Sequence, residues 1–335
     1  MSKVFRNWLE LIRLPAVFSA PADVLAAFAL GQTFGIELSI GTMLSLVAVA
    51  LLLYMAGMIS NDIFDLAVDT HERPERPLPS GRVSVSSAWC VAVGMQGLAL
   101  YLAYCQSPVS GHAAFALCAL TYLYNGVTKA QSVGPFVMGL CRGANVCLGL
   151  SVLPGFGLES GSWLMVLAII WYIWRVTMVS RYEVPVDGEE SRARRAIIRL
   201  RLSGLVLLLY VPLATLPLWG VLMLMCSTLI WLNVDVLRLR LRAIEGPVRF
   251  EVIRGLQGIL VTYTAVCIAF NALGIAMILC ACLLAGNALQ SGFMQRRFIR
   301  PGEYIRLHPS RFLALFRCCP QSLVSDPCAR CQRSL

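Results

Sequence analysis

The sequence predicts an all-α fold, a polytopic transmembrane bundle of nine to ten helices. Hydrophobic residues make up 58% of the 335 residues and charged residues only 14%, which is too little polar surface for a soluble domain of this length. The hydrophobic residues gather in runs, several of them near the ~20 residues that a spanning helix needs. Lys and Arg are concentrated in alternate connections between these runs. These three observations indicate an integral membrane protein.

Ten apolar runs follow one another along the chain. Most are long enough, or nearly so, to cross the hydrocarbon core of a bilayer. The seventh and eighth are separated only by a short connection at Pro217, so they form either two spans or one long, tilted helix that this proline breaks. The runs cover residues 15–35, 40–60, 86–105, 111–127, 134–153, 162–180, 203–216, 219–237, 252–270 and 272–290.

The positions of the basic residues predict an orientation. The formal net charge is +10, which by itself would also suit a nucleic-acid binder. The Lys and Arg residues, however, follow the second, fourth, sixth and eighth runs, while the connections near 36–40, 106–110 and 154–161 contain none. By the positive-inside rule both termini are cytoplasmic, and we expect a bacterial inner (plasma) membrane protein with no nucleic-acid partner.

The chain is expected to contain one membrane domain over residues 1–290 and a basic, cysteine-containing cytoplasmic tail over 291–335. No segment between the runs is long enough to form a separate globular domain. The tail contains a Cys-Cys pair and a later Cys-x-x-Cys, for which Zn²⁺ binding and lipidation are open alternatives. We favour a weakly ordered tail, because the cysteine spacing matches no familiar zinc motif.

Three carboxylates and an amide stand at the end of the second run. If the helix continues to residue 69, Asp62, Asp65 and Asp69 lie on one face, with Asn61 beside them. Carboxylates at a bilayer are costly unless their charge is offset. Mg²⁺ is commonly held by one or two carboxylates together with phosphate oxygens of a substrate. The stripe therefore predicts a metal-bridged phosphate ester, and a solvated helix end paired with nearby Arg is the structural alternative.

A second acidic pair follows the sixth run. Glu183 and Asp187 are i, i+4 partners if that helix continues, although Pro185 between them makes this geometry less secure. Both acidic clusters are expected on the same side of the membrane, where they can face each other and hold two or more divalent cations around a diphosphate. Taken alone, the second pair is explained equally well as a plain loop.

The first acidic motif and its surroundings resemble the UbiA superfamily of intramembrane prenyltransferases. The motif reads N-D-x-x-D-x-x-x-D at 61–69, and R-P-x-R-P-L-P-S-G follows at 73–81. The resemblance continues through Tyr124, Asn125 and Lys129 to the second acidic pair. It implies a helical bundle, usually of nine spans, that uses Mg²⁺ to bind an isoprenyl diphosphate. It also implies transfer of the prenyl group to an aromatic or other lipophilic acceptor.

The resemblance assigns roles to individual residues. The catalytic residues would be Asp62, Asp65, Asp69 and Lys129. The metal ligands would be Asn61, Asp62, Asp65, Asp69, Glu183 and Asp187, although the family more often has D-x-x-x-D at the last two. The Ser-Arg-x-Glu pattern at 180–183 is similar to the EboC-like branch. The diphosphate would be bound by Arg73, Arg76, Arg82, Tyr124, Arg142 and Arg181.

Besides Arg142, two charged residues within the predicted spans need an explanation, because intramembrane charges are costly. Arg175 either contacts the diphosphate or pairs with an acid on a neighbouring helix. Asp23, alone in the first span, either serves as such an acid or lines the acceptor pocket.

Two other functions are compatible with parts of the sequence. The string D-G-x-x-S-R at 187–192 resembles the start of the CDP-alcohol phosphatidyltransferase motif, which also needs a Gly and two Asp where this chain has Arg201, Leu205 and Leu209. That match fails. A membrane transporter or lipid-binding protein that uses the acidic stripes as a cation site remains an alternative, although transport would favour acids at mid-span.

Overall fold

The structure, a computed structural model, describes residues 3–33, 39–153, 162–182, 190–203, 248–269 and 272–297. All regular secondary structure in these residues is helical, as the composition predicts. The chain divides into two compact units, Met1–Asn287 and Ala288–Leu335, and of the second only the end of α14 is described. Most of the predicted pair of runs between 203 and 237 and most of the predicted tail lie outside the described residues.

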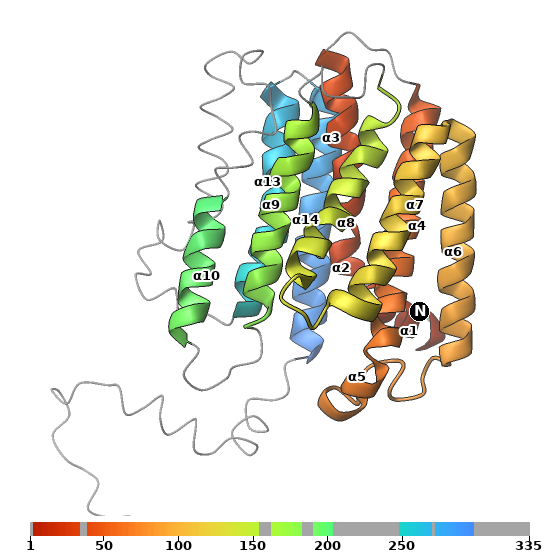
Figure 1. Cartoon of the computed structure of the whole chain (residues 1–335), viewed down its shortest axis with the longest axis vertical. Helices are drawn as coiled ribbons and strands as arrows, with labels where there is room; N and C mark the ends of the chain where they lie inside the picture. Colours follow the sequence, from red (N-terminus) through yellow and green to blue (C-terminus); the bar gives the residue numbers. More distant parts are fainter. Residues whose placement is uncertain are drawn as a thin grey trace, which may run out of the picture. The chain divides into compact units, whose positions relative to one another are not determined.

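The first unit is a bundle of long helices. Figure 1 shows α3, α4, α6, α7, α8, α9 and α13 standing side by side, with the short helix α5 at one end, here called the α5 end. The helices are α1 Lys3–Leu11, α2 Leu14–Val17, α3 Ser19–Thr33, α4 Ile40–Phe64, α5 Leu66–Glu72, α6 Val85–Gln106, α7 Pro108–Leu123, the π-helix η1 Tyr124–Thr128, α8 Gly134–Leu150, α9 Ser162–Ser180, α10 Glu190–Ser203, α13 Val248–Ala269 and α14 Leu273–Arg297.

Four of the described helices are long and apolar enough to cross a membrane: they contain the segments Ile40–Phe64, Val85–Gln106, Trp163–Ser180 and Glu251–Ile268. Serine caps fix where three of the long helices begin. The side chains of Ser39, Ser84 and Ser107 accept backbone N–H groups at the start of α4, α6 and α7, at 3.0, 3.2 and 3.0 Å. Pro108 follows Ser107 at the first position of α7, where no N–H is needed.

Glycines allow α8 to pack closely against two neighbours. A Cβ atom added at Gly149 would lie 2.9 Å from the Cα atom of Val24 on α3. One added at Gly139 would lie 2.5 Å from the carbonyl oxygen of Ile170 on α9. Small residues at such contacts let helix backbones approach each other, as is common in membrane bundles. α8 is therefore held tightly between α3 and α9.

A polar cluster lies inside the bundle, centred on the fully buried Asp23 of α3. Its carboxylate accepts hydrogen bonds from Asn145 Nδ2 of α8 at 2.6 Å and from the hydroxyl of Tyr263 of α13 at 2.7 Å. The Nε atom of Arg142 on α8 lies 2.7 Å from the same carboxylate. A buried carboxylate needs such partners. Asp23 is thus the ion-pair partner of Arg142, and the cluster joins three helices.

Candidate functional site

The aspartates of the first acidic motif lie where α4 passes into α5. Asp65 is the single residue between the two helices, with φ −82° and ψ −2°. Its N–H donates to the carbonyl of Asn61 at 3.0 Å, and its carbonyl accepts the N–H of Asp69 at 2.8 Å. Helical hydrogen bonding therefore continues across the junction. Asp62, Asp65 and Asp69 therefore lie along two helices that are nearly continuous and are interrupted only at Asp65.

Asp62 and Asp69 share one arginine. Their side chains are only 6% and 4% exposed, and Arg76, in the loop after α5, pairs with both. Nη1 of Arg76 lies 3.4 Å from Oδ1 of Asp62. A second cation reaches the same oxygen, because Nη2 of Arg13 donates to it at 3.0 Å. The two carboxylates are therefore stabilised by guanidinium groups from two separate parts of the chain.

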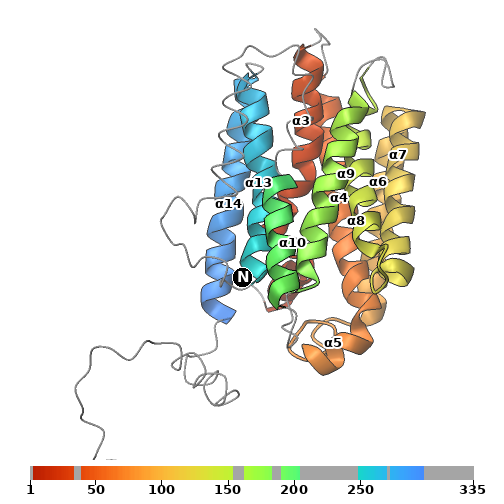
Figure 2. The ribbon, with the colours of Figure 1, turned by 60° about the vertical axis from the view of Figure 1, so that its left-hand side comes forward.

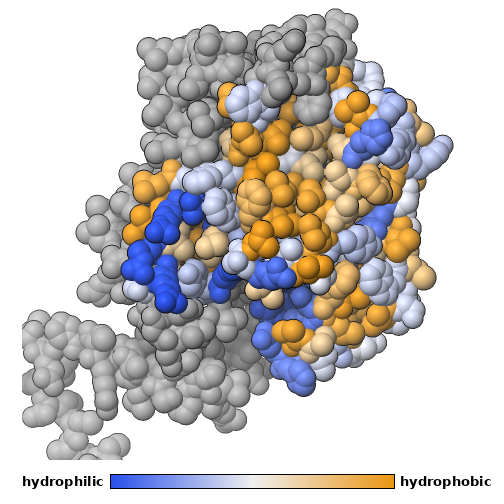
Figure 3. All heavy atoms as spheres, viewed as in Figure 1, coloured by the Kyte–Doolittle hydropathy of each residue, from blue (hydrophilic) through white to orange (hydrophobic). Residues whose placement is uncertain are grey.

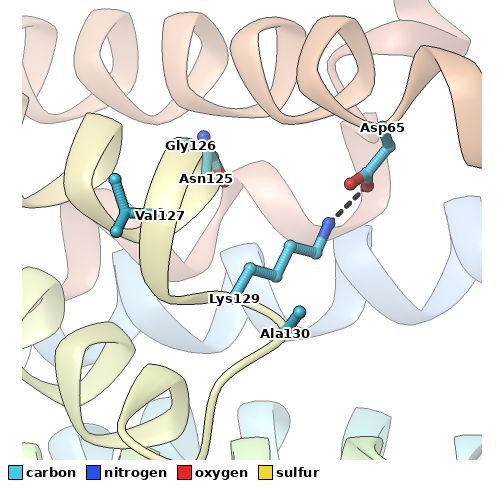
Figure 4. Close-up of a pocket in the computed structure, with 6 residues that line it drawn as sticks. All are labelled: Asp65, Asn125, Gly126, Val127, Lys129 and Ala130. Atoms are coloured by element: carbon cyan, nitrogen blue, oxygen red, sulfur yellow. Dashed lines mark hydrogen bonds and ion pairs between the residues drawn. The ribbon is translucent and has the colours of Figure 1, made fainter.

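Asp65 pairs with a lysine instead. Lys129 Nζ forms an ion pair with the Asp65 carboxylate, as Figure 4 shows, and donates to Oδ1 of Asn61 at 2.9 Å. The amide nitrogen of Asn61 in turn donates to the Asp65 carboxylate at 3.1 Å. Three side chains from two elements thus form one closed network. All three are expected in the site from the sequence, and the fold brings them together.

A π-helical turn positions Lys129. The segment Tyr124–Thr128 at the end of α7 is a π-helix, and the N–H of Lys129 donates to the carbonyl of Tyr124 at 2.9 Å. Single π-helical turns are rare and frequently mark functional sites. Here the wider turn ends at the lysine that faces α4. Nothing in the sequence of this segment predicts a π-helix rather than a continued α-helix.

A cavity of about 330 Å³ lies beside this network. It is lined by polar and small residues from the α4 to α5 junction and from η1 and the residues after it. Figure 4 shows the side chain of Lys129 extended across it toward Asp65. The lining residues are Asp65, Asn125, Gly126, Val127, Lys129 and Ala130.

Arg13 is a residue of this network that the sequence does not predict. It stands between α1 and α2 with φ 51° and ψ 53°, a left-handed conformation that is uncommon for a residue with a side chain. Burial acts to lower the pKa of Arg13, but the interactions with nearby groups, foremost the carboxylate of Asp62, together outweigh it, and the pKa is raised above its ordinary value. Its only sequence signal is its place just before the first apolar run, which other basic residues share.

Arg82 and Arg181 contact other parts of the protein rather than the aspartates. Arg82 Nη1 donates to Oδ1 of Asn7 at 2.9 Å and to the carboxylate of Glu10 at 3.3 Å, so it ties the loop after α5 to α1. Arg181, at the end of α9, donates to the carbonyl of Gln131 and holds the segment that follows Lys129. Both residues support the site from its edge.

Arg142 lies inside the bundle, paired with Asp23. Tyr124 begins the π-helix, and the N–H of Arg73 caps α5 by donating to the carbonyl of Asp69 at 2.8 Å. The second acidic pair, Glu183 and Asp187, lies outside the described residues.

The donor chemistry of the motif suits Mg²⁺ in one respect. Asn61, Asp62, Asp65 and Asp69 offer hard oxygen atoms, the type of ligand that Mg²⁺ prefers. Within the described ranges, however, no group of three or more His, Cys, Asp or Glu side chains is gathered closely enough to hold a metal ion. Mg²⁺ is commonly held by only one or two carboxylates together with phosphate oxygens of a substrate.

Solved structures share this fold. A UbiA homologue from Aeropyrum pernix K1 superposes with a TM-score of 0.59 at 17% identity, covering 76% of this chain and 97% of that one. A UbiA homologue from Archaeoglobus fulgidus bound to DMAPP and Mg²⁺ gives a TM-score of 0.54 at 18% identity, covering 76% and 99%.

Curated relatives are more similar in sequence but match a shorter stretch. The digeranylgeranylglyceryl phosphate synthase of Methanosarcina mazei is 30% identical over 184 residues, which is 51% of this chain and 63% of the relative. That of Sulfolobus acidocaldarius is 27% identical over 199 residues, 57% of this chain and 67% of the relative. The match thus spans about two thirds of the length of these relatives or slightly less. The model of the UbiA prenyltransferase family matches residues 20–251, more than half of the chain, and so the chain belongs to that family.

Proposed function

We propose that the protein transfers an isoprenyl group from an allylic isoprenyl diphosphate to a lipophilic acceptor in a membrane, with Mg²⁺ as cofactor. The observation that carries this proposal is the network at the α5 end, where three aspartates meet Arg13, Arg76 and Lys129 beside a cavity. Family membership supports the reaction class. Structures of a UbiA homologue from Archaeoglobus fulgidus, bound to DMAPP or to GPP with Mg²⁺, support the donor and the ion.

Each charged group has a task in this reaction. Asp62, Asp65 and Asp69, with the amide oxygen of Asn61, would hold Mg²⁺, which when bound neutralises charge on the departing diphosphate. Arg76 and Lys129 have N–H groups that can turn from the aspartates to diphosphate oxygens. The network then supplies both partners of a metal diphosphate: anions for the metal and cations for the phosphate oxygens.

The chemistry is a substitution at an allylic carbon. The C–O bond breaks, its electron pair leaves with the diphosphate, and the cationic allyl group is attacked by a nucleophilic atom of the acceptor, which loses a proton where it carries one. Cations preorganised around the leaving group lower the barrier, because they are already in place when charge develops. Water must be kept away from the allyl cation, and an apolar bundle interior does so.

The acceptor that we favour is a lipid with a glyceryl phosphate group. The curated relatives described above are named digeranylgeranylglyceryl phosphate synthases, and the chain resembles them over about half its length. An aromatic acceptor is the alternative that the wider family implies. We place the site at the cytoplasmic face of a plasma membrane, in accordance with the positions of the basic residues.

The test is a transfer assay with the purified protein in lipid nanodiscs. DMAPP, GPP and longer prenyl diphosphates are offered with a glyceryl phosphate lipid or with an aromatic acid, and the product mass is read out. We expect product only with Mg²⁺, and none after Asp65→Asn. Glu75→Gln is the matched control, because it removes a carboxylate from an exposed residue of the neighbouring loop. Undiminished turnover of Asp65→Asn would contradict the proposed site.

A further inference from the structure

The guanidinium group of Arg175 on α9 packs against tryptophan rings, and no carboxylate among the described residues pairs with it. The guanidinium carbon of Arg175 lies 4.4 Å from the ring centroid of Trp171 and 4.7 Å from that of Trp174. The Trp171 side chain is on the outer face of the helix and is 37% exposed. Indole faces hold a guanidinium group in place by cation–π attraction. Stacking of this kind leaves the N–H groups at the edge of the guanidinium plane available for a further partner.

A second arginine approaches from the neighbouring helix. α10 packs against α9, as Figures 1 and 2 both show, and exposed Arg199 on α10 is near enough for its positive charge to act on Arg175. Like charges brought together near a bilayer are costly. We call Trp171, Trp174, Arg175 and Arg199 the α9–α10 cationic cluster.

Other arginines close by are neutralised by protein, in contrast to this cluster. Arg201 of α10 donates to the carboxylate of Glu251 on α13 at 2.8 Å, and Arg254 lies 3.1 Å from the same carboxylate. Within the described ranges, neither Arg175 nor Arg199 has an ion pair with a carboxylate. The cluster thus contains two cations, one of them stacked on tryptophan rings. No carboxylate among the described residues is paired with either cation.

The surroundings of the cluster are those of a membrane surface. Figure 3 shows strongly hydrophilic side chains over α10 next to hydrophobic surface over the adjoining helices. Leu167 of α9 is 53% exposed, and Ile198 and Leu202 of α10 are 43% and 62% exposed. Cations bordered by exposed aliphatic and tryptophan side chains are typical of the region where lipid headgroups meet acyl chains.

We propose that the α9–α10 cationic cluster binds the phosphate group of an anionic phospholipid. Arg175 would donate in bidentate fashion to phosphate oxygens while stacked on Trp171, and Arg199 would supply the second positive charge. The acyl chains would lie on exposed aliphatic residues such as Leu167. This lipid is a bound partner of the fold, separate from the isoprenyl donor and from the acceptor, and its binding does not depend on the proposed reaction.

The experiment measures lipid binding directly. The detergent-purified protein is titrated with phosphatidylglycerol or phosphatidylcholine, and bound lipid is counted by native mass spectrometry. We expect a preference for phosphatidylglycerol that falls about fivefold in Arg199→Gln, since a basic residue near the surface contributes roughly 1 kcal/mol to anionic lipid binding. Arg175→Lys keeps the charge but loses the planar guanidinium group that can donate two N–H groups to one phosphate, so we expect it to weaken binding as well. Arg6→Gln, an exposed arginine of α1, is the matched control and should keep the preference.

Three outcomes would overturn the proposal. Equal loss in Arg6→Gln would show that general surface charge binds the lipid. Competition by millimolar inorganic phosphate, with no preference for phosphatidylglycerol, would assign the cluster to a free anion. An unchanged preference in both Arg199→Gln and Arg175→Lys would remove these residues from the binding site. Thermal unfolding of each variant in phosphatidylcholine alone shows that it is folded, so that a loss of lipid binding is not a loss of structure.

Discussion

Individual residues of the candidate site form ion pairs between carboxylates and cations. Asp65 with Lys129 and Asn61 could be anticipated from sequence, because the three belong to motifs that the family resemblance joins. Arg13 could not. Its contact with Asp62 spans 49 positions and depends on a left-handed turn between two short helices, and neither is encoded in a local pattern. A cation contributed from outside the motifs is visible only once the chain is folded.

We predict that Arg13→Gln weakens the enzyme toward its diphosphate substrate. Losing a hydrogen bond to a charged group costs about 1.5–3 kcal/mol, which corresponds to a roughly tenfold to hundredfold fall in kcat/KM. We expect the loss mainly in KM for the prenyl diphosphate, since Arg13 would turn from Asp62 to a diphosphate oxygen once the metal takes that carboxylate, and so would hold the leaving group in the ground state as well. Steady-state kinetics check this, with Arg6→Gln as a control on the same N-terminal segment. Identical kinetics for Arg13→Gln and the parent protein would exclude Arg13 from the site.

Among the structural elements, the loop after α5 determines which of its arginines contacts the aspartates. Arg76 and Arg82 both belong to this loop, but only Arg76 reaches the aspartates, while Arg82 reaches Asn7 and Glu10 of α1. From the sequence the two arginines have the same expected role, because the family resemblance assigns both to the diphosphate. The fold separates them. Gly81, with φ 70°, lies between them and permits the backbone turn that directs Arg82 toward α1.

We predict that Arg82 acts as a positioning residue through Glu10. Arg82→Ala should lower kcat/KM, because α1 and the loop would no longer be tied together and Arg13 and Arg76 would lose their alignment at Asp62. Glu10→Gln should lower it in the same direction. The double variant should be no worse than Arg82→Ala alone, since both changes break one contact. Arg82→Lys should restore part of the activity. Additive losses in the double variant would contradict a shared role.

At the scale of the whole molecule, composition and charge pattern predicted the helical bundle, and the structure confirms an all-helical fold in its described residues. The number of spans stays a prediction, because the pair between 203 and 237 lies largely outside those residues. The sequence could not show which polar groups on helices far apart in the chain contact each other. Asp23 meets Tyr263 across 240 positions. Periodicity places a residue on a face of a helix, but which face meets which neighbour depends on packing of all the helices together.

The charge balance of the site leads to a prediction for the stability of the whole protein. Asp62, Asp65 and Asp69 are already balanced by Arg13, Arg76 and Lys129. Mg²⁺ alone would have to displace a cation and leave it without a partner. Inorganic pyrophosphate alone would bring negative charge beside three carboxylates. Added together, they keep the balance, because the metal takes the carboxylates and the pyrophosphate takes the displaced cations.

We therefore expect Mg²⁺ and pyrophosphate to raise the Tm of the protein jointly and neither to do so alone. A ligand at a hundred times its Kd stabilises the native state by about 2.7 kcal/mol, which a thermal scan in nanodiscs resolves readily. Asp69→Asn should abolish the joint effect, because Arg76 would lose one of the two carboxylates it bridges and the metal would lose a ligand. Glu75→Gln should leave it intact. A full shift with pyrophosphate alone would mean that the arginines and the lysine bind the anion without exchanging partners, and that the aspartates have another task.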